Sequence, residues 1–316
     1  MGQVTWNVPG GRRSEVMLLN LTEDQGTKRN NTKLIMFWTR RSNRRNWFLF
    51  PENETTRLLS SITNCSRECI FTSDHSRLRE ADMLLFYRGE RPNWPRVRYA
   101  NQYYSNINYE APSWPQDIRY LQKYEGRINI TVNYRRDADF YIPYNTFVPR
   151  DNYQFRETHI PYRNKTKMVI WPVSHCYTRS HRENYVKELS KYIDVDIYGA
   201  CGKYKCSKSK GKTCLEEWER KYKFHLSFEN SICEDYITEK AFLPLLYELI
   251  PVVFGGGNYS RDMPPHSFIN ARDFNSPKHL ADFLISLAAD EQRYRSYFEW
   301  KKQYKIVGFY LWFTCR

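Results

Sequence analysis

The chain has 316 residues, of which 16% are aromatic and 27% charged, and its formal net charge is +14. This length is sufficient for two domains with substantial cores. The basic residues are scattered, and no zinc-finger, RNA-recognition or helix-turn-helix pattern occurs, so we expect no nucleic-acid partner. The positive charge instead favours a membrane surface or a small anionic ligand such as a nucleotide diphosphate.

In the first half of the chain, four apolar runs predict strands, at 34–39, 83–87, 128–132 and 140–142. Between the first two runs, residues 54–62 have the spacing of a helix. Residues 88–116 are rich in Arg, Tyr, Asn, Pro and Trp without a clear period, which is typical of loops. Polar, aperiodic residues around 150–166 mark a domain boundary.

After this boundary, strands and helices alternate. Strands are predicted at 168–173, 195–198, 224–228 and 251–254. Helices are predicted at 179–193, 215–222, 237–249 and 277–289, with another from Glu291. This alternation indicates a parallel sheet covered by helices on both faces. Pro244 lies inside the third helix, where a proline would kink it.

Sequons and cysteines indicate a chain that passes through the secretory pathway. Asn-x-Ser/Thr triplets occur at seven positions, where composition alone predicts roughly three. They begin at Asn20, Asn30, Asn53, Asn64, Asn129, Asn164 and Asn258. The eight cysteines are an even number without the tight paired spacing of a zinc site, which favours disulfide bonds.

The sequence itself contains no segment that predicts a membrane span. Its longest apolar stretch, 241–254, is short and is interrupted by Pro244, Glu248 and Pro251. Residues 1–20 lack the apolar core of a signal peptide. We therefore expect a missing anchor or signal upstream of the chain.

Residues 222–240 read YKFHLSFENSICEDYITEK and carry the strongest chemical signal. An apolar strand ends near Asn230, a polar turn follows, and Tyr236, Glu239 and Lys240 open the next helix. In open parallel sheets, ligands bind at the carboxyl ends of strands against helix N-termini. A helix start that offers Lys, Asn and Tyr side chains suits a phosphorylated ligand.

This segment, followed by IPVVFGG, resembles the signature of the eukaryotic α1,3-fucosyltransferases. Other segments that resemble motifs of this family are NYRRDADFYIPYN (133–145), VSHCYTRSHRENYVKEL (173–189), VDIYG (195–199), PHSFINARDFNSPKHLADFL (265–284) and RYRSYFEWKKQY (293–304). The resemblance covers about residues 128–305. Upstream of it, only NYEAPSW (108–114) is similar, as a variant of the ESP motif of the acceptor domain.

The resemblance implies an α/β protein of the GT-B fold, with two Rossmann-like domains facing a cleft. We expect a stem remnant at 1–33, an acceptor-binding domain at 34–160, a GDP-fucose-binding domain at 161–300, and a tail at 301–316 that packs back on the first domain. The implied reaction is the inverting transfer of L-fucose from GDP-fucose to O3 of N-acetylglucosamine in a glycoprotein or glycolipid glycan. It requires no metal or other cofactor. The implied location is the Golgi lumen, as the lumenal part of a type II membrane protein.

The same resemblance implies roles for individual residues. Lys240 and Arg182 would hold the diphosphate, where two cations can substitute for a metal ion as charge develops on the leaving group. The Glu239 carboxylate would accept hydrogen bonds from the ribose hydroxyls. The other donor contacts would come from Asn230, Tyr236, Ser174 and Tyr134. Glu110, in the 108–114 segment, would be the general base that deprotonates the acceptor hydroxyl.

Two alternative functions stay open at this point. A metal-dependent GT-A glycosyltransferase would use an Asp-x-Asp triplet, and two occur, at 137–139 and 194–196. The first lies in the RRDAD segment and is better explained as structural, whereas Asp196 of the second lies in an apolar strand. A secreted glycan-binding protein without catalysis would fit the aromatic content and the sequons. It would not need the cluster of Tyr236, Glu239 and Lys240.

Overall fold

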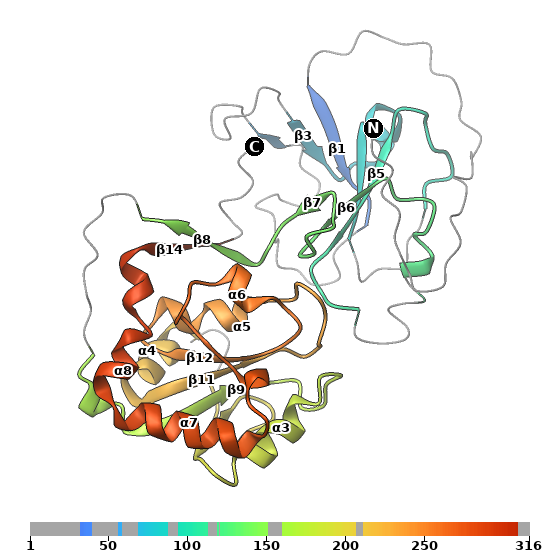
Figure 1. Ribbon diagram of the computed structural model, residues 1–316. Coiled ribbons are helices and arrows are strands. Elements are labelled where there is room, and N and C mark those ends of the chain that lie inside the picture. The colour runs from blue at the N-terminus through green and yellow to red at the C-terminus, as the bar shows by residue number, and fades with distance from the viewer. Residues whose placement is uncertain are drawn as a thin grey trace. The chain divides into compact units, whose positions relative to one another are not determined.

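The protein is described by a computed structural model. The described residues are 32–39, 56–58, 69–87, 94–112, 119, 121–150, 160–206 and 211–308. Internal contacts divide them into two units, one that ends at Ile142 and one that begins at Pro143. Each unit is built on a mainly parallel sheet, and the strands of both sheets can be followed in Figure 1. The predicted α/β class with two Rossmann-like parts is confirmed, and the cleft between the parts stays a prediction.

The first unit contains a seven-stranded sheet with the order β2-β3-β1-β4-β5-β6-β7. Its strands are β1 (Lys33–Phe37), β2 (Thr56–Leu58), β3 (Cys69–Thr72), β4 (Met83–Tyr87), β5 (Tyr103–Asn108), β6 (Ile130–Asn133) and β7 (Phe140–Tyr141). All neighbours are parallel except β2, which runs antiparallel to β3. A 3-10 helix, η1 (His75–Glu80), follows β3. The four strands predicted in this half are confirmed within a few residues.

The prediction of a helix at 54–62 is wrong for residues 56–58, which are the ones that the structure describes. Residues 56–58 form β2, which pairs with β3 through Arg57 opposite Ile70. Backbone pairing with β3, which is distant in sequence, overrides the local helical spacing. The other residues of this predicted helix lie outside the described part of the chain.

The second unit contains a five-stranded parallel sheet with the order β10-β9-β11-β12-β13. Its strands are β9 (Lys167–Pro172), β10 (Val195–Tyr198), β11 (Tyr222–Phe228), β12 (Ile250–Phe254) and β13 (Ile269–Asn270). The helices are α3 (Arg182–Leu189), α4 (Gly211–Lys221), α5 (Glu239–Phe242), α6 (Tyr259–Asp262), α7 (Pro277–Ala289) and α8 (Glu291–Ser296). Short 3-10 helices are η2 (Tyr162–Asn164), η4 (Pro244–Leu246), η5 (Ala271–Asp273) and η6 (Glu299–Lys302). The predicted alternation of strand and helix is confirmed.

Both faces of this sheet are covered, because alternate residues of a strand point to opposite sides. Val252 of β12 packs in the cluster that includes Leu284 of α7 and Leu189 of α3, whereas its neighbour Val253 packs with Phe242 of α5. All seven residues of β11 are buried. Figure 1 shows α3 and α7 together on one side of the sheet. The central strand β11 is thus covered on both faces, so a ligand can approach it only at its ends.

The helix predicted at 237–249 is broken. α5 ends at Phe242, and the chain continues as the 3-10 helix η4 from Pro244. Proline has no N–H to donate to an α-helix, and its ring clashes with the preceding turn. Only one turn of α-helix therefore follows the loop that carries Tyr236, so the helix dipole adds little to any ligand site here.

The division between the units lies upstream of the boundary that the sequence predicts at residue 160. β8 (Asn145–Pro149) pairs antiparallel with β14 (Tyr304–Gly308), and its Phe147 packs against Phe242 and Trp300. This ribbon joins residues 145–149 to the second unit. Residues 301–308 of the predicted tail belong to η6 and β14, whereas 309–316 and most of the predicted stem lie outside the described residues.

In the described part of the chain, no helix is long and apolar enough to cross a bilayer.

Lys165 holds the amino-terminal edge of the second sheet together. Its side chain is only 1% exposed, and its Nζ donates to the backbone oxygens of Glu219, Tyr222 and Glu248. These three carbonyls belong to the end of α4, the start of β11 and the approach to β12. Burial lowers the pKa of Lys165 to about 8, although the nearby charges of Glu248 and Glu219 oppose this shift.

We predict that Lys165→Met lowers the free energy of unfolding by about 3 kcal/mol or more, because three buried carbonyl oxygens lose their donor. Urea unfolding followed by tryptophan fluorescence measures the change. Lys187→Met, on the exposed face of α3, is the matched control and should change the free energy by less than about 0.5 kcal/mol. Equal effects of the two substitutions would contradict the structural role of Lys165.

Candidate functional site

Polar side chains converge at the carboxyl-terminal edge of the second sheet. Ser174 follows β9, Arg182 opens α3, and Asn230 follows β11. Glu239 and Lys240 form the first turn of α5. Because all strands of this sheet run in the same direction, their carboxyl ends meet at one edge, as the sequence predicts.

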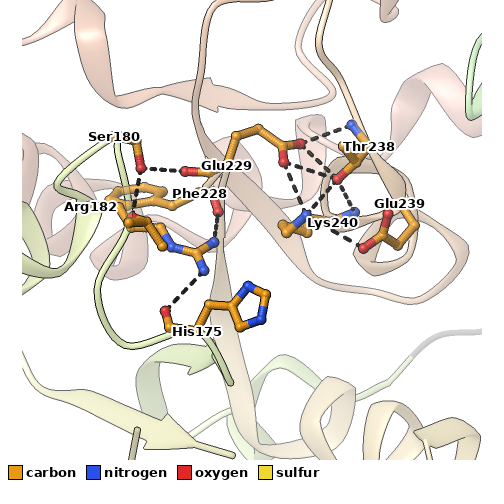
Figure 2. A network of polar contacts seen from close by, with 9 residues as sticks. His175, Ser180, Arg182, Phe228, Glu229, Thr238, Glu239 and Lys240 are labelled. Atoms are coloured by element: carbon orange, nitrogen blue, oxygen red, sulfur yellow. Dashed lines mark hydrogen bonds and ion pairs between the residues drawn. The ribbon is translucent and has the colours of Figure 1, made fainter. Parts of the chain in front are cut away.

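A buried glutamate organises this edge. Glu229 directly follows β11 and has no exposed surface. Its carboxylate accepts hydrogen bonds from the backbone N of Thr238 at 2.9 Å and from the Thr238 hydroxyl at 2.9 Å. It also accepts one from Lys240 Nζ at 3.1 Å. Figure 2 shows the contacts that run from this carboxylate to Thr238 and to Lys240, so Glu229 ties the start of α5 to the end of β11.

Lys240 is positively charged in this environment. Burial alone would lower the pKa of its ammonium group, but the charges of Glu229 and Glu239 outweigh burial, and the pKa is raised. Burial in turn raises the pKa of the Glu229 carboxyl, and the Lys240 charge opposes that shift. Only 28% of the Lys240 side chain is exposed, so its charge is presented over a limited surface.

Arg182 provides the second cation. It is buried, its Nη1 donates to the backbone oxygen of Phe228, and its Nη2 donates to that of His175 at 3.3 Å. These contacts anchor the guanidinium beside the end of β11, as Figure 2 shows. Burial lowers the pKa of Arg182, which nevertheless titrates far above neutral pH in proteins and stays charged.

Three buried polar atoms at this edge have no hydrogen-bond partner in the described structure. They are Nε of Arg182, Oδ1 of Asn230 and the hydroxyl oxygen of Tyr259. An unsatisfied buried donor or acceptor costs about 1–3 kcal/mol, and such groups in a folded protein are commonly satisfied by water or a ligand. These atoms are the ones at this edge whose hydrogen bonds the protein itself does not supply.

The remaining predicted residues of this unit differ in their exposure. Tyr236 is buried, and its ring meets that of Tyr144 edge-on at 6.2 Å between centroids. Glu239 is 51% exposed, and its Oε1 lies 3.5 Å from Lys240 Nζ. Ser174 is exposed. Tyr236 therefore forms part of the wall, whereas Glu239 and Ser174 are open to solvent.

Glu110 and Tyr134 belong to the first unit. Glu110 is exposed two residues after β5, and its backbone N donates to Asn108 Oδ1 at 3.0 Å. Tyr134 is buried directly after β6, whose last residue, Asn133, is paired with Asn108. Both residues lie at the carboxyl-terminal edge of the first sheet. That they share a cleft with Lys240 stays a prediction.

Sequence reasoning did not single out Glu229 and Thr238. An acidic residue directly after a fully buried strand, as Glu229 is, signals a paired carboxylate. Thr238 stands at the N-cap position of α5, where its hydroxyl accepts from Lys240 N at 3.4 Å. A threonine just before Glu-Lys is a recognisable helix start.

Disulfide bonds brace the connections at this edge. Cys176 is bonded to Cys201, which joins the loop after β9 to the turn after β10, and Cys206 is bonded to Cys214. The predicted use of cysteines in disulfides is thus confirmed for these four. Cys65 and Cys315 lie outside the described residues.

The two Asp-x-Asp triplets have structural partners. Asp137 forms an ion pair with Arg135 at 2.6 Å, and Asp139 accepts from the backbone N of Thr131 at 2.8 Å. Asp196 is bonded to Lys167 and to the hydroxyl of Tyr222. Within the described ranges, no three His, Cys, Asp or Glu side chains are grouped as metal ligands.

Comparison with known proteins identifies the family. Residues 162–315 match the C-terminal part of glycosyltransferase family 10 (fucosyltransferase), and residues 30–145 match an N-terminal fucosyltransferase domain. A 4-galactosyl-N-acetylglucosaminide 3-alpha-L-fucosyltransferase of Homo sapiens is 33% identical over 300 residues, which cover 91% of this chain and 75% of the human protein. The chain belongs to the eukaryotic α1,3-fucosyltransferase family. The predicted enzyme class, a glycosyltransferase, is thereby confirmed.

The chain is also similar to a fly protein and to a solved structure. The glycoprotein 3-alpha-L-fucosyltransferase A of Drosophila melanogaster is 40% identical over 254 residues. The match covers 78% of this chain but only 49% of the fly protein, so the chain spans about half of that relative. A crystal structure of an α1,3-fucosyltransferase matches 88% of this chain and 83% of its own, with a TM-score of 0.49 and 16% identity.

Proposed function

We propose that the chain transfers L-fucose from GDP-fucose to O3 of an N-acetylglucosamine residue in a glycan, with inversion at the fucose C1. The observation that carries this proposal is the pair of cations, Lys240 and Arg182, anchored from two different connections at one edge of the second sheet. The human and fly relatives are named as 3-alpha-L-fucosyltransferases, which supports the sugar and the position.

The GDP leaving group requires electrostatic stabilisation. When the bond between fucose C1 and the β-phosphate oxygen breaks, negative charge develops on that oxygen. Preorganised cations stabilise such charge without having to reorient during the reaction. We assign this role to Lys240 and Arg182, whose ammonium and guanidinium groups are already held by Glu229 and by backbone oxygens. Arg182 Nε and Asn230 Oδ1 add a free donor and a free acceptor for the donor substrate.

The acceptor hydroxyl must lose its proton as it attacks. In our proposal, the Glu110 carboxylate takes the proton from O3 while O3 bonds to C1 from the face opposite to GDP. A single displacement of this kind inverts the configuration. GDP departs with its electron pair, and Glu110 returns the proton to solvent.

We assign the remaining contacts with GDP-fucose from the exposure and the position of the predicted side chains. Glu239 is sufficiently exposed to accept the ribose hydroxyls, and Tyr236 and Ser174 border the same edge. Tyr134 would reach the donor only if the edges of the two sheets face one another, as in a GT-B fold. No step in this scheme requires a metal ion or another cofactor.

The two alternative functions explain fewer of the features of this site. A glycan-binding protein without catalysis gives no reason for two anchored cations beside an unpartnered donor and acceptor. A GT-A enzyme would need an available Asp-x-Asp pair, whereas Asp137 and Asp196 are engaged with Arg135 and Lys167.

We place the protein in the Golgi lumen, acting on glycans of glycoproteins or glycolipids. The disulfides Cys176–Cys201 and Cys206–Cys214 support an oxidising compartment, as do the seven sequons. In this proposal, the full-length protein is a type II membrane protein.

Lys240→Met should weaken GDP binding roughly 10- to 100-fold, because a charge-assisted contact of about 1.5–3 kcal/mol is lost. Isothermal titration calorimetry measures this affinity. The double variant Lys240→Met/Glu229→Gln removes the buried carboxylate that the single change leaves without its cation. Lys187→Met is the control. Unchanged GDP affinity in both Lys240 variants would remove Lys240 from the donor site.

Glu110→Gln should reduce fucose transfer by about 10²–10⁴-fold while GDP affinity stays the same, because only the proton acceptor is removed. Transfer is measured with GDP-fucose and a panel of N-acetylglucosamine-containing glycans. Glu125→Gln, at an exposed glutamate of the same unit, should transfer normally. Normal turnover by the Glu110 variant would mean that another group is the base.

Transfer should persist when EDTA removes divalent metal ions, because Lys240 and Arg182 supply the positive charge on the diphosphate. The rate with EDTA is compared with the rate in added Mn²⁺. Activity that disappears in EDTA and returns with Mn²⁺ would favour the metal-dependent alternative.

A further inference from the structure

Three acceptors surround the Lys240 ammonium group. They are Thr238 Oγ1 at 2.9 Å, Glu229 Oε2 at 3.1 Å and Glu239 Oε1 at 3.5 Å. A lysine ammonium has three hydrogens to donate, so the protein itself already occupies all three directions. A diphosphate oxygen can bind Lys240 closely only if one of these partners gives way.

The three partners differ in how easily they can leave. Glu229 and Thr238 have no exposed surface, and they are bonded to each other through the Thr238 hydroxyl and backbone N. Glu239 is 51% exposed, and its contact with Lys240 is at the upper limit of a hydrogen bond. Moving Glu229 would leave a buried carboxylate without a cation, whereas Glu239 can turn into solvent.

We infer that Glu229 is a positioning residue that fixes the Lys240 ammonium group, and that the donor diphosphate replaces Glu239 as the third partner of Lys240. The displaced Glu239 carboxylate is then available for the ribose hydroxyls of the same ligand. This inference rests on the proposed function, because it takes Lys240 as a diphosphate-binding cation. Figure 2 shows Glu229 and Glu239 on different sides of the lysine.

The charge of Glu229, and not only its shape, matters in this arrangement. The charged or titratable groups that face the pair are Glu239 of α5, Arg182 of α3 and Tyr259 of α6. Burial lowers the pKa of Lys240, and so does the positive charge of Arg182. The negative charges of Glu229 and Glu239 raise it. Without the Glu229 charge, only Glu239 would oppose burial and Arg182, so Lys240 would lose its proton at a lower pH than in the wild type.

The first test is the pH dependence of GDP affinity in Glu229→Gln, which keeps the shape of the side chain and an oxygen for Thr238 N. We expect the ratio of its GDP affinity to that of the wild type to fall several-fold as the pH rises from 7.5 to 9, because the amide no longer raises the pKa of Lys240. The terminal phosphate of GDP has its last pKa at about 6, and the guanine ring begins to lose its N1 proton at the alkaline end of this range. The affinity of the variant is therefore divided by that of the wild type at each pH, so that the titration of GDP itself cancels. Glu229→Asp keeps the charge and should restore a constant ratio at reduced affinity.

Glu248→Gln is the matched control. Glu248 is a partly buried carboxylate at the opposite edge of the sheet, where it lies near Lys165 and Lys301, and its pKa is also raised by burial. Its removal should leave the ratio of GDP affinities constant over the same pH range. A merely structural role of Glu229 would lower stability in Glu229→Gln without introducing a pH dependence.

The second test needs only the exposed Glu239, so it does not depend on the folding of a core variant. Glu239→Gln should bind inorganic pyrophosphate more tightly than the wild type, because pyrophosphate no longer competes with the carboxylate for Lys240. The same variant should bind GDP more weakly, because the ribose contact is lost. Glu183→Gln removes a nearby carboxylate that bonds to Thr178 instead of Lys240, and its effect on pyrophosphate affinity should be smaller.

The outcomes separate the two levels of the argument. A constant affinity ratio in Glu229→Gln, or weaker pyrophosphate binding by Glu239→Gln, would overturn the inference. The proposed function would then still stand if Lys240→Met loses GDP affinity. If Lys240→Met binds GDP normally, the proposed function itself fails.

Discussion

The buried ion pair between Glu229 and Lys240 is the constraint on which the site in the second unit depends. A carboxylate with no exposed surface is costly unless cations and hydrogen-bond donors surround it. Here the donors are the backbone and hydroxyl of Thr238 and the ammonium of Lys240. Satisfying Glu229 therefore folds the loop from 230 to 238 back onto the end of β11. This places a cation at the open edge of an otherwise covered sheet.

The parallel topology supplies the second cation. Arg182 starts the helix after β9, and β9 is the neighbour of β11, so its guanidinium can reach the backbone oxygen of Phe228. Two connections that are distant in sequence thus deliver positive charge to one edge. Because both cations are anchored before a ligand arrives, little reorganisation is required when charge develops on a leaving diphosphate.

Much of the second unit could be predicted from sequence, because its strands are apolar runs between clear turns. Arg182, Asn230 and Lys240 could be predicted as site residues because they lie in segments that resemble motifs of the family. Other features depend on contacts that no local pattern reveals. The burial of Glu229 follows from the covering of β11 on both faces, and the edge pairing of residues 56–58 overrides their helical spacing. The ribbon of β8 with β14 joins residues more than a hundred positions apart, which shifts the division between the units. The acceptor glycan could not be predicted, since the resemblance is thin before residue 128.

The most direct test of the account is a crystal structure of the protein with GDP bound. The account predicts that diphosphate oxygens lie within hydrogen-bond distance of Lys240 Nζ and of the Arg182 guanidinium, with Glu229 still bonded to Lys240 and Glu239 turned toward the ribose. A diphosphate bound away from Lys240 and Arg182 would contradict the central claim that these two cations hold the leaving group.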